Sequence, residues 1–319
     1  MRPSLPLTLL LGLAACAAGP RLPAAAVDPG AQRCAPWTPP ASPLELVVLG
    51  SGGPRSYGRA SSAYAVLVDG VPRVLVDARP GAAVRWGALG LDFERLDTYL
   101  LTHLHIDHAG DLPGVVKSRD LSFSQPLTFR LFGPTGGGDY PSTSAFVAAL
   151  FGETGAFRYL KDFRNELTLE VTDVPAARGG APRVLLEEPD LRVLAVAVDH
   201  DDVPALAFRI EAHGRAVVVS GDLGSSDDAL VGLARGAEVL VYDATVLDPP
   251  AASPLLYRLH TAPARIGEVA ARAGVKALVL SHLTPSVEAA PEAVLASVAH
   301  SYRGPVRLAE DCLRVPATP

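Results

Sequence analysis

The chain has 319 residues, a formal net charge of −6, 49% apolar residues and 19% charged residues. It contains 29 glycines, 29 prolines and only three cysteines, which excludes a disulfide-rich mini-protein, a disordered acidic chain and a membrane protein with many spans. Because 34 acidic residues outnumber 28 basic ones, the charge balance predicts that the protein does not bind nucleic acid.

The N-terminal segment has the pattern of an export signal. Residues 1–16 contain one arginine, an apolar run and then small residues before Cys16. Leu13, Ala14 and Ala15 before this cysteine resemble the bacterial lipobox, in which the cysteine becomes the lipidated first residue; an ordinary signal peptide is the alternative. We expect an exported lipoprotein on the periplasmic face of a membrane, in the outer membrane by this pattern, held there only through a lipid on Cys16.

Residues 17–43 are rich in proline and alanine, which predicts an extended tether between the signal and the folded part. If Cys16 carries a lipid, Cys34 and Cys312 are the two cysteines that remain. In an oxidising compartment we expect them to form a disulfide that joins the two ends of the domain, with two free thiols as the alternative.

From residue 44 onward, short apolar runs alternate with turn-forming residues, and no linker-like break divides residues 44–319, which predicts a single domain. In the first half we expect strands at 44–49, 63–68, 73–76, 98–101 and 127–132, and helices at 82–89 and 142–151. In the second half we expect strands at 191–198, 205–210, 216–220, 239–242 and 277–281, and helices at 226–234, 261–273 and 291–300. Two such halves predict an α/β fold with two sheets sandwiched between helices.

The pattern H-x-H-x-D-H follows the strand expected near residue 101. His103 and His105 project to the same side because strand side chains alternate, and Asp107 and His108 follow at the next turn. Imidazole and carboxylate donors without a thiolate suit two adjacent zinc ions. The alternative is a set of histidines paired with one another in a polar core.

Three further donors each follow an apolar run. His200, Asp222 and His282 lie at the ends of expected strands, where ligands converge at one edge of a sheet. Taken singly, His200 and His282 are equally compatible with surface loops. His213 and His300 lack such a placement, and we expect both to be exposed.

The order of these motifs resembles the metallo-β-lactamase superfamily, in its ribonuclease Z and arylsulfatase-like branch. The resemblance runs from Leu46 to Leu283 through LGSGGP, RASS, THLHIDHAGDLPG, DHDDVPALAFRIE, SGDLG and LHTAPARIGEVAARAGVKALVLSHLTP. It implies a four-layer αββα sandwich with a metal site at one edge of the two sheets, and a metal-dependent hydrolase of ester bonds, phosphodiester or sulfuric ester.

The resemblance also implies a role for each site residue. One zinc ion is held by His103, His105 and His200, and the other by Asp107, His108 and His282. Asp222 bridges the two ions, and Asp77 supports the histidine loop. Zinc is the expected metal, with manganese and iron left open.

The mechanism implied by the resemblance uses Asp107 to orient a hydroxide ion shared by the metals and to accept its proton. His260, oriented by Asp243, protonates the leaving group. The alternative for His260 is an exposed residue at the start of a helix.

The spacing of the later motifs suggests which substrate is cleaved. His200 and Asp222 are only 22 positions apart, which leaves no room for the basic arm that ribonuclease Z carries between these motifs. Together with export and acidic charge, this favours a small phosphodiester or sulfate ester as an anionic small-molecule substrate, without nucleic acid. Hydrolysis of a β-lactam or lactone, tRNA 3′-end processing, and a non-catalytic lipoprotein are the alternatives, and a homodimer is left open.

Overall fold

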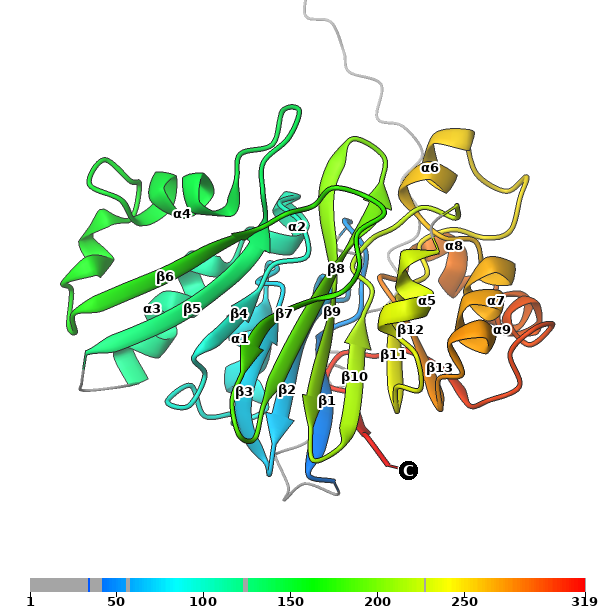
Figure 1. The fold of residues 1–319 in the computed structure, drawn as a ribbon, viewed down its shortest axis with the longest axis horizontal. Coiled ribbons are helices and arrows are strands. Elements are labelled where there is room, and N and C mark those ends of the chain that lie inside the picture. The colour runs from blue at the N-terminus through cyan, green and yellow to red at the C-terminus, as the bar shows by residue number, and fades with distance from the viewer. Residues whose placement is uncertain (1–33, 35–41, 56–57, 123–125, 227, 319) are drawn as a thin grey trace, which may run out of the picture. The chain divides into compact units, whose positions relative to one another are not determined.

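The computed structural model describes residues 34, 42–55, 58–122, 126–226 and 228–318 (Figure 1). The expected signal at 1–16, with the lipid on Cys16, and nearly all of the expected tether at 17–43 lie outside these residues. The described part contains two seven-stranded sheets and helices.

The first sheet has the strand order β14-β1-β2-β3-β4-β5-β6. Its strands are β1 (Leu44–Gly50), β2 (Ala63–Val68), β3 (Val71–Val76), β4 (Thr98–Leu100), β5 (Leu127–Pro134), β6 (Leu167–Val174) and β14 (Arg314–Pro316). Strands β14, β1, β2 and β3 pair antiparallel, whereas β3, β4, β5 and β6 pair parallel. The carboxyl ends of the parallel strands therefore meet at one edge.

The second sheet repeats this arrangement with the order β13-β12-β11-β10-β9-β8-β7. Its strands are β7 (Arg183–Glu187), β8 (Arg192–His200), β9 (Val203–Ala212), β10 (Arg215–Val219), β11 (Val239–Asp243), β12 (Ala277–Ser281) and β13 (Val306–Leu308). Strands β7 to β10 pair antiparallel and β10 to β13 pair parallel, so this sheet also gathers strand ends at one edge.

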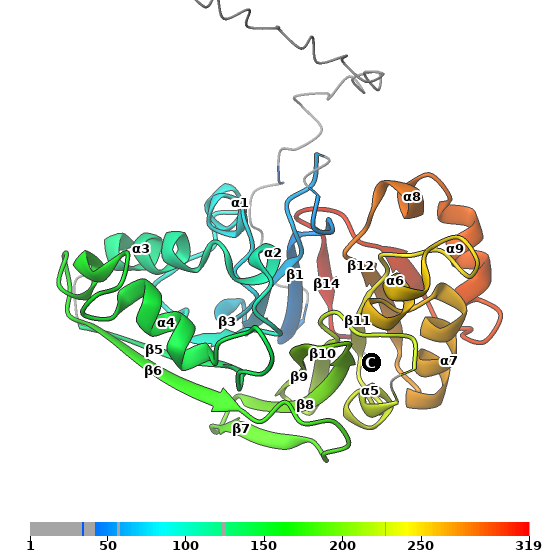
Figure 2. The same cartoon turned by 90° about the horizontal axis from the view of Figure 1, so that it is seen from above.

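The helices lie on the outer faces of the two sheets (Figure 2). They are α1 (Ala82–Ala88), α2 (Ile106–Ala109), α3 (Leu112–Ser122), α4 (Thr143–Phe151), a 3₁₀ turn η1 (Arg158–Lys161), α5 (Ala229–Leu233), α6 (Pro254–Leu259), α7 (Pro263–Ala273), α8 (Pro285–Glu288) and α9 (Pro291–Val298). Within the described ranges, no helix combines the length and the apolar character needed to cross a membrane.

Three apolar clusters hold these layers together. One lies between the sheets and includes Val66 and Phe208, which are fully buried. A second packs Trp86 of α1 and Leu112 of α3 on the outer face of the first sheet, and a third packs Ile266 of α7 on the outer face of the second. Burial of these side chains is the main favourable contribution to folding. The four-layer α/β sandwich expected from the sequence is confirmed.

Local sequence signals explain which elements were predictable. Helix α7 begins with Pro263 in its first turn and is followed by Gly274, which adopts φ +64°, so its boundaries carry standard start and stop residues. Strands β6 and β7 were not expected because half or more of their positions are exposed or partly exposed. Helix α3 was missed because its sequence LPGVVKSRDLS contains a glycine and lacks a clear apolar period.

The two ends of the domain are joined by a disulfide between Cys34 and Cys312, whose Cα atoms are 5.4 Å apart and 278 positions apart in sequence. The backbone N–H of Cys312 also donates to the carbonyl oxygen of Val48 on β1, at 2.7 Å. The expected pairing is confirmed.

We predict that the double variant Cys34→Ser/Cys312→Ser is less stable by roughly 3 kcal/mol, with a Tm about 6–12 °C lower, because the crosslink restricts the unfolded chain. Thermal unfolding followed by circular dichroism measures this. A reductant should lower the Tm of the wild type but not of the variant; equal Tm values for the two oxidised proteins would contradict the prediction.

Candidate metal centre

The polar residues singled out in the sequence lie where the strands of both sheets end. His200 is the last residue of β8, Asp222 follows β10, and His282 follows β12. Asp77 after β3 and His282 have φ angles of +59° and +61°, which non-glycine residues adopt rarely. Such backbone conformations recur at functional sites, where they turn a side chain out of the strand direction.

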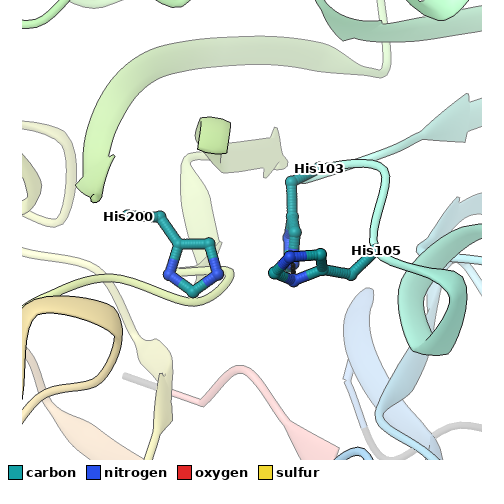
Figure 3. Close-up of side chains that lie close together, drawn as sticks. All are labelled: His103, His105 and His200. Atoms are coloured by element: carbon teal, nitrogen blue, oxygen red, sulfur yellow. Dashed lines mark hydrogen bonds between the residues drawn. The ribbon is translucent and has the colours of Figure 1, made fainter. Parts of the chain in front are cut away.

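The first group of donors consists of three imidazoles (Figure 3). His103 Nε2 lies 2.9 Å from His105 Nδ1, and the ring of His200 faces both, with centroid separations of 4.8 Å and 5.3 Å. One nitrogen atom from each ring lies within 4.8 Å of the others. The structure therefore brings together the three residues expected to hold the first ion, and their role as ligands stays a prediction.

The lowered pKa values of these three imidazoles favour their neutral form, which can donate a lone pair to a metal ion. Burial lowers the pKa of His103 well below its ordinary value and lowers the pKa of His200 to about 4. Burial also lowers the pKa of the partly buried His105. At neutral pH each ring therefore keeps a lone pair for a cation.

Hydrogen bonds fix which nitrogen of each ring is available. His200 Nδ1 donates to the carbonyl oxygen of Leu259 at 2.8 Å, and His105 Nε2 lies 2.9 Å from the hydroxyl of Tyr140. Within the described chain, Nε2 of His200 is buried without a hydrogen-bond partner. Metal-binding histidines typically have this arrangement, with one nitrogen held by the protein and the other directed to the ion.

The second group contains carboxylates as well as imidazoles. Asp222 Oδ2 lies 3.3 Å from His108 Nε2 and 3.2 Å from His282 Nε2, and Asp107 Oδ2 lies 3.7 Å and 3.6 Å from the same two atoms. Asp222 also forms a group with His103 and His108, so it lies between the two sets of donors, where a bridging ligand is expected. Burial alone would raise the pKa of Asp222, but His282 and His108 hold it well below its ordinary value.

Asp77 and Thr245 hold the rings of this second group. Asp77 accepts hydrogen bonds from the backbone N–H of Thr102 and from His108 Nδ1, both at 2.8 Å, in keeping with its expected supporting position. Thr245 Oγ1 lies 2.5 Å from His282 Nδ1. The Nε2 atom of His282 has no hydrogen-bond partner among the residues that the structure describes, which leaves it available to a cation.

The second group also contains an arginine that the sequence did not point to. The Arg79 side chain is 1% exposed, and its Nη2 atom lies against both ring nitrogens of His108. Its Nη1 atom is 3.6 Å from Asp107 Oδ2 and its Nη2 atom is 3.7 Å from Asp222 Oδ1. Both donor sets have the chemistry to bind a divalent cation. Among the described residues, the first group contains no competing positive side chain, whereas the guanidinium of Arg79 lies among the donors of the second group.

His260 lies beside the second group and is buried rather than exposed. Its Nδ1 atom is 2.7 Å from Asp243 Oδ2 and 3.9 Å from Asp222 Oδ2. Burial on its own lowers the pKa of His260, but the charge and hydrogen bond of Asp243 outweigh it and raise the pKa to about 9. The ring is therefore a protonated donor at neutral pH, held by the carboxylate that the sequence assigned to it.

Some residues were missed and some lie elsewhere. Tyr140, Thr245 and Arg79 gave no sequence signal beyond their positions in loops that follow strands. His213 and His300 are exposed, as predicted, and His213 Nε2 pairs with Asp69 Oδ2 at 2.9 Å.

Comparisons with known proteins agree with this architecture. The sequence model of the family described as "Beta-lactamase superfamily domain" matches residues 66–283. Ribonuclease Z of Mycobacterium avium (strain 104) is 30% identical over 283 residues, covering 85% of this chain and 98% of that protein. The crystal structure of the short form of human tRNase Z is similar with a TM-score of 0.67 at 21% identity, covering 86% of this chain and 99% of that chain. The metallo-β-lactamase fold protein YhfI from Bacillus subtilis has a TM-score of 0.63 at 18% identity, covering 86% and 99% of the two chains.

The fold and the donor clusters define a metal-dependent hydrolase, which confirms the expected class of enzyme and implies that the protein binds divalent metal. The chain belongs to the metallo-β-lactamase superfamily, in the branch that contains the ribonucleases Z.

The expected substrate is wrong. The sequence favoured a small anionic ester and no nucleic acid, whereas relatives matched along almost their whole length are named ribonuclease Z. Net charge misled because it sums groups over the entire molecule, while substrate binding depends on charges near the site. A missing arm likewise removes one binding element without changing the catalytic edge.

We predict that His200→Ala weakens zinc binding by at least about 100-fold, because loss of a direct ligand costs more than loss of an outer partner. Zinc per chain after dialysis, measured by inductively coupled plasma mass spectrometry, tests this. The matched control is His300→Ala, which removes an exposed histidine and should retain its zinc. Equal zinc contents in the two variants would contradict the assignment.

Proposed function

We propose that the protein is a zinc-dependent endoribonuclease of the ribonuclease Z type, which cleaves a phosphodiester bond at the 3′ side of a tRNA-like RNA. The observation that carries this proposal is the match to a ribonuclease Z over 98% of that protein's length. The location of His260 beside the second donor group supports it, because hydrolysis of a phosphodiester benefits from a proton donor for the leaving oxygen.

Two zinc ions are the proposed cofactors. His103, His105 and His200 would hold one, and Asp107, His108 and His282 would hold the other, with Asp222 shared between them. Bound there, the ions supply charge that polarises phosphate oxygens and lowers the pKa of water to near neutrality.

Two side chains of the protein would carry out the proton transfers, one as acceptor and the other as donor. Asp107 is partly buried, and His282 and His108 hold its pKa well below the ordinary value against the effect of burial, so it is an ionised acceptor that can orient the attacking water. His260, protonated below about pH 9, donates to the leaving oxygen. Asp243 keeps that ring oriented through the hydrogen bond to Nδ1.

A cavity next to His260 offers space for the nucleotide beside the cleaved bond. Its volume is about 490 Å³, which is within the range of small-molecule sites, and apolar side chains such as Leu247, Leu256 and Leu283 contribute to its walls. Apolar walls of this kind can pack against the flat face of a base.

The location of the enzyme is a separate proposal. The export signal at 1–16 and a lipid on Cys16 would place the domain in the periplasm, and the disulfide between Cys34 and Cys312 supports an oxidising compartment. The RNA that it meets would then be RNA present outside the cytoplasm. Fractionation of cells tests this: the wild type should be found with membranes and Cys16→Ser should not, and a cytoplasmic wild type would contradict it.

Cleavage of an end-labelled tRNA precursor with a 3′ extension tests the proposed activity. We predict zinc-dependent cleavage that a chelator abolishes, and a kcat about 10²–10⁴-fold lower for His260→Ala because the proton donor is lost. His300→Ala is the matched control and should cleave normally. Absence of cleavage by the zinc-loaded wild type would overturn the function, and loss of zinc from His260→Ala would overturn the role of this histidine.

We also predict that Asp243→Asn moves the alkaline limb of the pH profile of kcat to lower pH. A proton donor with a raised pKa is fully protonated at low pH and loses activity as the pH rises through about 9. Without the carboxylate the pKa of His260 falls, so the limb should move about 1–3 pH units lower. The control Asp69→Asn breaks the surface pair with His213 and should leave the profile unchanged; an unshifted limb in Asp243→Asn would contradict the prediction.

A further inference from the structure

We propose that Arg79 is an internal cation of the second metal subsite, and that the second divalent ion binds only by displacing its guanidinium. The two subsites would then load in order, first the one formed by His103, His105 and His200, and later the one that Arg79 occupies. This inference rests on the metal site and does not depend on the RNA substrate.

The location of the guanidinium is the first argument. Arg79 is the third residue after β3, and its side chain lies beside the second donor group, where it is 1% exposed. Its charged partners are Asp107 and Asp222, and its Nη2 atom contacts the ring of His108. All three are residues expected to bind the second ion, so the guanidinium lies among those ligands.

The hydrogen bonds of Arg79 are the second argument. Over the part of the chain that the structure describes, its Nε and Nη1 atoms are buried and have no hydrogen-bond acceptor. A buried arginine with a purely structural role is usually held by several such bonds, as Arg119 is by the carbonyl oxygens of Phe93 and Glu94. Apart from the contact of Nη2 with the ring of His108, Arg79 is therefore held in the site by charge, and another cation can replace it.

The carboxylates explain why a cation is needed before the second ion arrives. Asp222 is buried and Asp107 is partly buried, and other groups hold the pKa of each carboxyl below its ordinary value, so both are ionised groups in the interior that need compensating charge. Arginine supplies such charge at every relevant pH, because its guanidinium does not lose its proton in proteins. Arg79 can thus stabilise the site when only the first ion is bound.

The loop that carries Arg79 is coupled to the ligand helix. The backbone N–H of Ala78 donates to the carbonyl oxygen of His108 at 2.8 Å, and Asp77 accepts from Nδ1 of the same residue. These hydrogen bonds hold His108 in place, so binding of the second ion requires only the side chain of Arg79 to move. None of His103, His105 and His200 is an ion-pair partner of Arg79 among the described residues, whereas the shared residue Asp222 is, so the affinity of the first subsite should depend less on this arginine than that of the second.

Zinc titration of the metal-free protein by isothermal calorimetry, without RNA, tests the proposal. For the wild type we expect two steps, with the second weaker than the first by about 100-fold or more. Arg79→Met keeps the length of the side chain and removes its charge, and it should tighten the second step by about tenfold or more while the first changes little. Arg79→Lys keeps a cation there and should retain the weak second step.

Arg119→Met is the matched control, since it removes another buried arginine and should leave both steps as in the wild type. If Arg79→Met does not fold, Arg79→Gln takes its place, and zinc per chain at limiting zinc is measured alongside. An unchanged or weaker second step in the uncharged variants would overturn the proposal. Because no RNA is present, this result is independent of whether the protein cleaves RNA.

Discussion

The site depends on one physical constraint. Several carboxylates lie close together at the buried edge where the strands end, and nearby positive charge must compensate them. Asp77, Asp222 and Asp243 are buried and Asp107 is partly buried. Keeping an ionised carboxylate in the interior is costly unless a cation is close. The three imidazoles of the first group have lowered pKa values and do not supply that charge. Within the described chain, positive charge comes from Arg79, from protonated His260, and from His108, whose pKa is raised, against the effects of burial and of Arg79, by Asp222 and Asp77; divalent ions would contribute the rest.

The fold brings these groups together through the ends of its strands. Parallel pairing of β3 to β6 in one sheet and β10 to β13 in the other directs their carboxyl ends to a common edge. The apolar cluster between the sheets fixes the distance between the two edges, so donors from both can approach one another. His260 joins them from the segment between α6 and α7, and Asp243 at the end of β11 fixes its ring.

Local pattern was enough to predict much of this arrangement. The motif H-x-H-x-D-H marked His103 and His105, but the expected strand alternation does not explain their approach, because β4 ends at Leu100 and both residues lie in the loop before α2. Apolar runs followed by His200 or His282 mark the site edge. Arg79 and Tyr140 escaped prediction because their contacts depend on the path of loops, which no short-range periodicity encodes. The substrate was predicted wrongly for a similar reason: a total charge of −6 does not describe the charges close to the site.

Anomalous X-ray diffraction at the zinc absorption edge, from crystals grown with limiting zinc, tests the central claim most directly. The account predicts a strong peak among Nε2 of His103, Nδ1 of His105 and Nε2 of His200, with the Arg79 guanidinium still beside Asp107 and Asp222. In excess zinc it predicts a second peak between Asp222 and His282 and a displaced guanidinium. Zinc found only outside these two groups would contradict it.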